Sequence, residues 1–262
     1  MSYYKVEQLH EGIYSLWEPT EVCSFLVVGE KSAVLYDTGF GMDDLLGAVR
    51  EITGLPLEVV LSHGHYDHVN GAFQFDGAWI HPADEVLALR HASRTGRRNA
   101  IGDGFARKVP DTLDREAYIH AGAGTLKALE IGRLFDPGGL TVEVIALEGH
   151  TSGSVGLLIH ERRVLLAGDA LGPHIWMFLA DSLPLEAYLA MLARVQTLPF
   201  DHFYIGHSNE KRPRSDIALY ESVARNIDVN RSTAYPRLPE LGGMLYEEEH
   251  DGKVVGIVFK PD

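Results

Sequence analysis

A short stretch of the chain, residues 61–71, carries four side chains that could bind metal ions. It reads Leu-Ser-His-Gly-His-Tyr-Asp-His-Val-Asn-Gly, so His63, His65, Asp67 and His68 lie within six positions. Imidazole nitrogens combined with a carboxylate suit zinc, iron or manganese, whereas calcium prefers oxygen ligands alone. We therefore predict a transition-metal site here, and two sets of ligands from one loop can serve two adjacent metals.

The residues before this stretch indicate how the ligands are positioned. Residues 57–61 form a short aliphatic and β-branched run that is typical of a buried strand. His63 and His65 are two positions apart on its extended end, so their side chains should point the same way. Gly64 between them permits an unusual backbone angle, and the turn beyond it supplies the other two ligands.

Further residues of metal-binding type follow other predicted strands. His150, Asp169 and His207 each come shortly after an apolar run, and Asp37 ends another run of this kind. Loops at one edge of a sheet are where open α/β folds gather functional groups. Each residue alone is a weak signal, since a histidine after a strand is more often structural than a ligand. Together with the first stretch they predict one shared site.

Composition and charge limit the function. The chain has 262 residues, of which 45% are apolar and 23% charged, as in an ordinary globular enzyme with a core of its own. The formal net charge of −14 repels phosphate backbones and anionic membranes. We therefore expect a small-molecule substrate, with no nucleic acid and no membrane as a partner. A homodimer is compatible with the sequence.

The compartment is inferred from cysteine usage and from the lack of targeting signals. Cys23 is the single cysteine, so no intramolecular disulfide can form, which fits a reducing compartment. The chain shows no signal peptide and no apolar run long enough to span a bilayer. We expect a cytoplasmic protein.

The hydrophobic pattern predicts strands and helices that no linker separates, so we expect a single domain over residues 1–262. Strands are expected within 3–17, 23–28, 32–36, 57–61, 78–81, 140–147, 155–160, 163–166 and 203–205. Helices are expected at 42–52, 82–92, 184–197 and 215–230. The tail at 243–259 is predicted to form a β-hairpin around Asp251-Gly252.

Residues 93–125 have the least regular pattern and are predicted to be an insertion. Basic residues gather in and just before it: Arg90, Arg94, Arg97, Arg98, Arg107 and Lys108. In an acidic protein this local excess could attract an anionic group of the substrate. A solvated insertion without such a role explains the pattern equally well.

The order of the motifs resembles that of the metallo-β-lactamase superfamily, from about residue 13 to residue 210. In that family the motifs run His-x-His-x-Asp-His, then His, Asp and His. They match His63, His65, Asp67, His68, His150, Asp169 and His207. The resemblance implies an α+β fold, a four-layer αββα sandwich with the metals at one edge of the β-sandwich. Two divalent ions are implied, with zinc expected first and iron or manganese as alternatives.

The resemblance also implies how the ligands divide. One ion would be held by His63, His65 and His150. The other would be held by Asp67, His68 and His207. Asp169 would bridge both ions, and Asp37 would support the ligands from behind.

Departures from the family pattern point to a glyoxalase II-like or lactonase-like branch. True β-lactamases usually lack a bridging aspartate, so Asp169 disfavours them. The C-terminal hairpin replaces the basic helical region of glyoxalase II, and no tyrosine follows Asp169 shortly, as it does in acyl-homoserine lactonases. The short segment from Asp169 to His207 leaves no room for the inserted domain of RNA-processing nucleases.

A dimetal centre lowers the pKa of a bridging water, so that hydroxide exists near neutral pH, and an open site polarises the substrate carbonyl. The expected function is hydrolysis of a small ester, thioester or lactone by attack of that hydroxide, with Asp169 also handling the proton. The alternatives are a phosphodiesterase and a mononuclear-iron persulfide dioxygenase. A non-catalytic metal-binding protein is the least favoured hypothesis, because all seven ligand positions are filled.

The segment after Asp169 reads His174-Ile-Trp-Met-Phe-Leu179. We predict that Trp176 and Phe178 form a wall of the substrate pocket. His174 would act there as a hydrogen-bond donor or proton shuttle. The alternative is that these residues pack against the following helix or a subunit interface.

Overall fold

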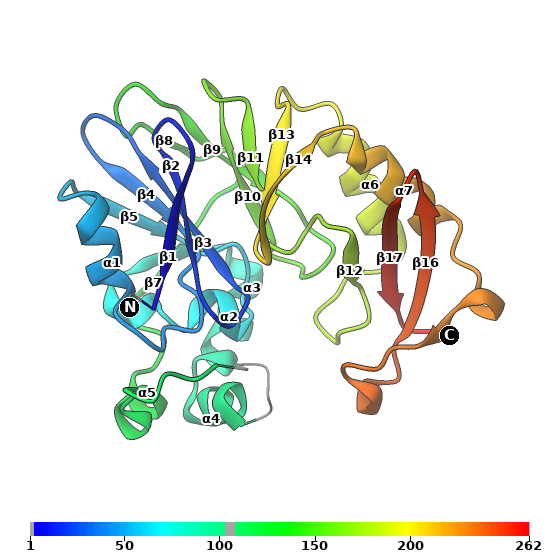
Figure 1. Cartoon of the computed structure of the whole chain (residues 1–262), viewed down its shortest axis with the longest axis horizontal. Coiled ribbons are helices and arrows are strands. Elements are labelled where there is room, and N and C mark those ends of the chain that lie inside the picture. The colour runs from blue at the N-terminus through cyan, green and yellow to red at the C-terminus, as the bar shows by residue number, and fades with distance from the viewer. Residues whose placement is uncertain (1–2, 103–107, 262) are drawn as a thin grey trace.

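The computed structural model describes residues 3–102 and 108–261, which form two large β-sheets, a smaller sheet and the helices that cover them (Figure 1). The first sheet contains β1 (Lys5–His10), β2 (Ile13–Trp17), β3 (Cys23–Val28), β4 (Ala33–Tyr36), β5 (Leu57–Val60), β6 (Ala78–Ile80) and β7 (Leu126–Ala128), in that order. The second contains β14 (Ser208–Pro213), β13 (His202–Ile205), β11 (Val164–Leu166), β10 (Val155–Ile159), β9 (Val142–Ala146) and β8 (Leu134–Phe135).

Helices cover the outer face of each of these two sheets, and two more lie below the first sheet (Figure 1). They are α1 (Leu45–Ile52), α2 (Tyr66–Val69), α3 (Pro82–His91), α4 (Arg94–Gly102), α5 (Arg115–His120), α6 (Leu185–Val195) and α7 (Asp216–Arg225). Short 3-10 turns occur at Ala72–Gln74, Val229–Arg231 and Pro239–Leu241. Figure 1 shows α1 to α3 beside the first sheet, and α6 and α7 at the opposite side of the molecule.

Strand β4 shows why the sheets are stacked in this way. All four of its residues are buried, and successive side chains of a strand point to opposite faces. Val34 and Tyr36 join the core between the two sheets, together with Leu157 of β10. Leu35 instead joins the core under the helices, with Val49 of α1. Because the second sheet is covered by α6 and α7 in the same manner, the predicted αββα sandwich is confirmed.

A third, four-stranded sheet was not expected from the sequence. Its order is β12 (His174–Trp176), β17 (Lys253–Phe259), β16 (Met244–His250) and β15 (Thr233–Ala234). Strands β16 and β17 form the hairpin predicted for the tail, and β12 pairs with β17 in parallel. The C-terminal hairpin is thereby attached to the segment that follows Asp169.

All four predicted helices are shorter than their patterns indicated, by one to six residues. Helix α1 begins at Leu45, because the side chain of Asp44 caps it by accepting from the backbone N–H of Gly47. Helix α7 ends at Arg225, and Asp228 caps a separate 3-10 turn. Capping by Asp44 therefore sets the start of α1, and a turn capped by Asp228 replaces the last part of the helix predicted at 215–230.

The insertion at 93–125 contains α4 and α5, and Arg97 fits neither of the two alternatives left open for its basic residues. Arg97 is completely buried and lies between the rings of Phe73 and Tyr118. Its Nη2 donates to the carbonyl oxygens of Asn70 and Gly122 at 2.7 and 2.6 Å. Arg97 therefore cannot attract a substrate from solution. Arg107, another residue of the basic cluster, lies outside the described residues.

Among the residues that the structure describes, no helix combines the length and apolar character needed to cross a bilayer.

Candidate metal centre

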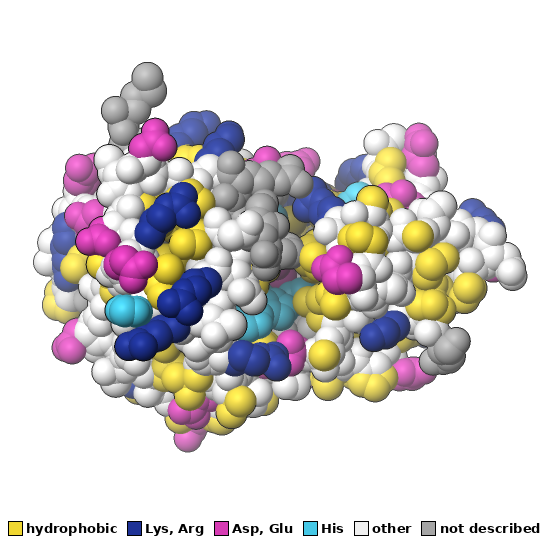
Figure 2. Space-filling model, turned by 90° about the horizontal axis from the view of Figure 1, so that it is seen from below, with side chains coloured by type: hydrophobic (Ala, Val, Ile, Leu, Met, Phe, Trp, Pro, Cys, Tyr) yellow, Lys and Arg dark blue, Asp and Glu magenta, His cyan; other side chains and the backbone are white. Residues whose placement is uncertain are grey.

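The strand directions bring the predicted ligands to one place. Strands β4 and β5 are parallel, so Asp37 and the loop that begins at Leu61 leave the first sheet at the same edge. Strands β11 and β13 are also parallel, so Asp169 and His207 follow neighbouring strand ends of the second sheet. His150 comes from the loop between β9 and β10. Figure 2 shows histidine side chains in a hollow between the two sides of the molecule.

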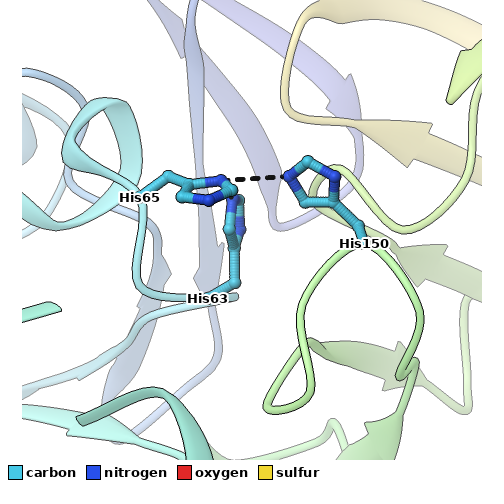
Figure 3. A group of neighbouring side chains, drawn as sticks. All are labelled: His63, His65 and His150. Atoms are coloured by element: carbon cyan, nitrogen blue, oxygen red, sulfur yellow. Dashed lines mark hydrogen bonds between the residues drawn. The ribbon is translucent and has the colours of Figure 1, made fainter. Parts of the chain in front are cut away.

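Three histidines form what we call the first ligand group: His63, His65 and His150. Nδ1 of His65 lies 3.0 Å from Nε2 of His63 and 3.0 Å from Nε2 of His150. Figure 3 shows the three rings converging from two loops. Two nitrogens bound to a tetrahedral zinc ion are separated by roughly 3.3 Å, given Zn–N bonds of about 2.0–2.1 Å. The group thus has nearly the spacing of a ligand set.

The outer nitrogens of two of these histidines already have partners. Nδ1 of His63 lies 2.9 Å from the hydroxyl of Ser62, and Nδ1 of His150 lies 2.8 Å from the carbonyl oxygen of Trp176. A carbonyl can only accept, so Nδ1 of His150 carries the proton and Nε2 keeps its lone pair for a metal. Such outer contacts are typical of histidines that bind metals.

The second ligand group consists of Asp67, His68 and His207. Nε2 of His207 lies 3.5 Å from the carboxylate of Asp67 and 3.1 Å from that of Asp169. Nε2 of His68 lies 3.4 Å from the same oxygen of Asp169. His63, His68 and Asp169 form a further cluster that could hold a metal, so Asp169 lies where the two groups meet.

Outer contacts orient the second group as well. Nδ1 of His68 donates to Oδ2 of Asp37 at 2.8 Å, and Nδ1 of His207 donates to the carbonyl oxygen of Glu21 at 2.8 Å. Oδ1 of Asp37 accepts from the backbone N–H of Ser62 at 2.6 Å. Asp37 has a positive φ of 65°, a conformation that is strained for a residue other than glycine. The fold holds this strained residue where it orients His68.

The unpaired atoms of the site fit a bound cation. Nε2 of His68 and Oδ1 of Asp169 are both buried, and neither has a hydrogen-bond partner among the described residues. Leaving such atoms buried without a partner is costly, and a metal ion would satisfy both. Gly206 makes room beside them, because a Cβ atom there would lie 2.6 Å from Oδ1 of Asp169.

Electrostatics distinguishes the two groups. Burial, with the neighbouring histidines, holds the pKa values of His63 and His65 well below the usual range, so both rings stay neutral. Partial desolvation lowers the pKa of the half-exposed His207, but the carboxylates of Asp169 and Asp67 outweigh it and raise that pKa to about 9. The pKa of His68 is likewise raised well above its usual value by three carboxylates, Asp169 foremost, despite burial.

Asp169 experiences the opposite balance. Burial alone would raise its pKa, but the positive charges of His207 and His68 hold the pKa of this carboxyl well below its usual range. Asp169 is therefore ionised at neutral pH, which is the form in which a carboxylate can bind a metal ion.

The structure places the predicted substrate residues in and beside the third sheet. Nε2 of His174 lies 2.6 Å from a carboxylate oxygen of Glu247, and both side chains are about 40% exposed (42% and 41%). Trp176 and Phe178 pack edge-to-face with each other and with Tyr235, with ring centroids 5.6 Å apart. Phe178 is buried in this cluster, whereas Trp176 is partly exposed. The roles predicted for these residues stay predictions.

Several residues that shape the site were missed in the sequence. The carbonyl groups of Glu21 and Trp176 give no sequence signal, because every residue carries a carbonyl. Asp84 did give a signal. It lies on α3 three and four positions before Leu87 and Ala88, so a carboxylate shares the buried face of that helix.

Comparison with known families and proteins supports this interpretation of the motifs. The sequence model described as "Metallo-beta-lactamase superfamily" matches residues 17–207. An acyl-coenzyme A thioesterase MBLAC2 of Bos taurus is 27% identical over 189 residues, which cover 65% of this chain and 67% of that protein. The hydroxyacylglutathione hydrolase GloC of Haemophilus influenzae is 29% identical over 157 residues, 57% of this chain and 66% of that protein.

Solved structures share the fold. A metallo-beta-lactamase from Pontibacter korlensis aligns with a TM-score of 0.59 and 17% identity, over 86% of this chain and 100% of that one. A metallo-beta-lactamase family protein from Thermus thermophilus aligns with a TM-score of 0.57 and 23% identity, over 82% and 80% of the two chains. At these identities the similarity shows the architecture alone.

Proposed function

Because the chain belongs to the metallo-β-lactamase superfamily, we propose that its two ligand groups bind two divalent metal ions and hydrolyse a thioester, ester or lactone. The observation that carries this proposal is the position of Asp169 between the groups. Its carboxylate lies 3.1 Å from Nε2 of His207 and 3.4 Å from Nε2 of His68, and it forms a cluster with His63 of the first group. Zinc is the metal we propose first.

The residues present fit two ions of this kind. Neutral imidazoles and carboxylates suit zinc, iron or manganese. When bound, two such ions supply an activated water nucleophile and polarise the substrate carbonyl. The protein's own contribution is to fix the ligands: Asp37 orients His68, and the carbonyl oxygen of Trp176 orients His150. No serine or cysteine nucleophile is then required.

Exposure of the ligands indicates the side from which a substrate enters. His63, His68 and His150 are almost completely buried, whereas the side chain of His207 is 42% exposed. Solvent and substrate therefore reach the site past His207. Asp169 can accept a proton from the water nucleophile only as a carboxylate. His207 and His68 stabilise that form.

A thioester on an anionic carrier is the substrate class that we favour. The similar proteins MBLAC2 and GloC are named for hydrolysis of acyl-coenzyme A and hydroxyacylglutathione. Figure 2 shows both basic and hydrophobic side chains around the hollow. Arg94 and Arg98 of α4 are exposed, and across the molecule Leu179, Leu238 and Leu245 pack around the aromatic cluster of Trp176. The basic residues thus match the anionic carrier of such a substrate, and the apolar surface matches its acyl group.

The test is an activity screen on protein loaded with a defined metal. Acyl-coenzyme A, hydroxyacylglutathione, a lactone, a β-lactam and bis-nitrophenyl phosphate are compared, and bound metal is counted by elemental analysis. We expect two ions per chain and the highest kcat/KM for a thioester. A single iron per chain with oxygen consumption on a persulfide would instead support the dioxygenase, and turnover of the phosphate diester alone would support a phosphodiesterase.

A further inference from the structure

A carboxylate that belongs to neither ligand group lies behind the first one. Asp84 is in the first turn of α3 and is only 1% exposed, on the helix face that also buries Leu87 and Ala88. A charged side chain at such a position is rarely buried unless it has partners. Its partners belong to the loops that carry the metal ligands.

Both oxygens of Asp84 accept hydrogen bonds, and the donors lie on two different loops. Oδ2 accepts from the backbone N–H of Gly64 at 2.8 Å and from the hydroxyl of Thr151 at 2.7 Å. Oδ1 accepts from the backbone N–H of Gly153 at 2.7 Å. Hydrogen bonds to a carboxylate are short and strong, so this residue connects the two loops firmly.

The donors are the immediate neighbours of the first ligand group. Gly64 lies between His63 and His65 in the chain, and Thr151 directly follows His150. Asp84 therefore joins the loop of His65 to the loop of His150. Nδ1 of His65 and Nε2 of His150 lie 3.0 Å apart. A backbone contact from the N–H of Val155 to the carbonyl of Ser62 joins the same two segments nearer the strand ends.

We propose that Asp84 is a positioning residue that holds these two loops at the spacing the first metal ion requires. It acts through Gly64, Thr151 and Gly153, and it contacts no ligand side chain within hydrogen-bond distance among the described residues. Conformational freedom of the two loops is removed by the protein before the ion binds. Loss of the carboxylate therefore weakens binding of the first ion.

The test measures metal affinity in a His207→Ala background, in which the second ligand group lacks a ligand. Asp84→Asn keeps the shape of the side chain but places an NH₂ group against a backbone N–H donor, so one bond becomes a repulsion. Zinc affinity is measured by competition with a chromophoric chelator, and cobalt(II) absorption reports the geometry of the ligands. We expect about a 10- to 100-fold loss of affinity, the range typical of outer contacts to metal ligands, and an altered cobalt spectrum.

Two further variants separate positioning from general destabilisation. Thr151→Val removes one of the three donors and leaves Asp84 in place, so we expect a smaller loss of affinity in the same direction. Val223→Ala removes a buried methyl pair from α7 and should lower Tm without changing metal affinity. If Asp84→Asn does not fold, Thr151→Val decides the question alone.

The proposal is overturned if the asparagine variant binds zinc within about twofold of its parent, or if Val223→Ala weakens binding equally. Because the readout is metal affinity, the inference rests on the proposed metal centre but not on the substrate. A protein that hydrolyses no thioester would refute the substrate class and leave this test unaffected.

Discussion

The carbonyl oxygen of Trp176 accepts a hydrogen bond from Nδ1 of His150 at a distance of 2.8 Å. Trp176 ends β12, which pairs with β17 of the C-terminal hairpin, and the N–H of Met177 donates to the carbonyl of Val258 at 2.7 Å. The matched family region ends at residue 207, so β17 lies outside it. A strand outside the matched region thus pairs with the strand whose last carbonyl orients one ligand of the first group.

The side chain and the backbone of Trp176 make separable contributions. Trp176→Ala retains the carbonyl that orients His150 but removes a partly exposed ring, so we expect KM for the substrate to rise with the metal content unchanged. Phe178→Ala is the matched comparison, since its buried ring should leave a cavity and lower stability by about 3 kcal/mol. Loss of metal from Trp176→Ala, measured by elemental analysis, would count against a pocket role.

Removal of one ligand should affect one group at a time. His207→Ala leaves His63, His65 and His150 intact, so we expect one retained ion per chain. His150→Ala should instead release the ion of the first group. Both variants should lose roughly 100-fold or more in kcat, because the proposed reaction uses both ions. Two ions retained in His207→Ala would contradict the assignment of the second group.

Metal uptake should depend on pH differently in the two groups. Metals bind deprotonated imidazole, and at pH 7 His63 and His65 are already neutral, whereas His68 and His207 are protonated. The second group must therefore release protons when it fills, and its affinity should rise as pH increases towards 9. Calorimetry in two buffers of different ionisation heat counts the protons. Equal release from both groups would be inconsistent with these pKa values.

Glu18 should destabilise the metal-free protein above neutral pH. Its side chain is completely buried and Oε1 has no partner among the described residues, so burial raises its pKa to about 7. For a carboxyl with a raised pKa, the penalty is absent below the unfolded value of 4.5 and grows until the pH passes about 7. Glu18→Gln should therefore raise stability at pH 8 by up to about 3 kcal/mol, and not at pH 4. Urea unfolding at both pH values measures this difference.

The proton-transfer role predicted for His174 can be separated from its surface hydrogen bond with Glu247. If His174 is a proton shuttle, His174→Gln should lower kcat by roughly tenfold or more and leave the metal content unchanged. The control is Glu247→Gln, which removes the partner 2.6 Å away and leaves the imidazole in place. If both variants retain the parental kcat across the pH profile, His174 serves only the hydrogen bond between β12 and β16.

Much of this architecture can be predicted from the sequence. Short apolar runs that end in His63, Asp169 or His207 indicate strands, and parallel strands must present such ends at one edge. The αββα sandwich was expected from the resemblance to the metallo-β-lactamase superfamily, and strands buried on both faces, such as β4, give its physical reason. These features are local, because hydrophobic period and ligand spacing are properties of neighbouring residues.

Contacts between distant segments of the chain could not be predicted from the sequence and are seen only in the tertiary structure. Nothing near Arg97 in the chain indicates that its guanidinium is buried between Phe73 and Tyr118, since charge alone suggested an exposed residue. The pairing of β12 with β17 depends on backbone groups that every residue carries.

The sequence by itself determined which side chains could bind metal and in which order the strands deliver them. Only the tertiary structure decided which carbonyl orients His150 and that Asp84 connects two loops. The physical reason is that ligand chemistry belongs to the residue type, whereas a hydrogen bond between positions 84 and 151 exists only after the chain has folded.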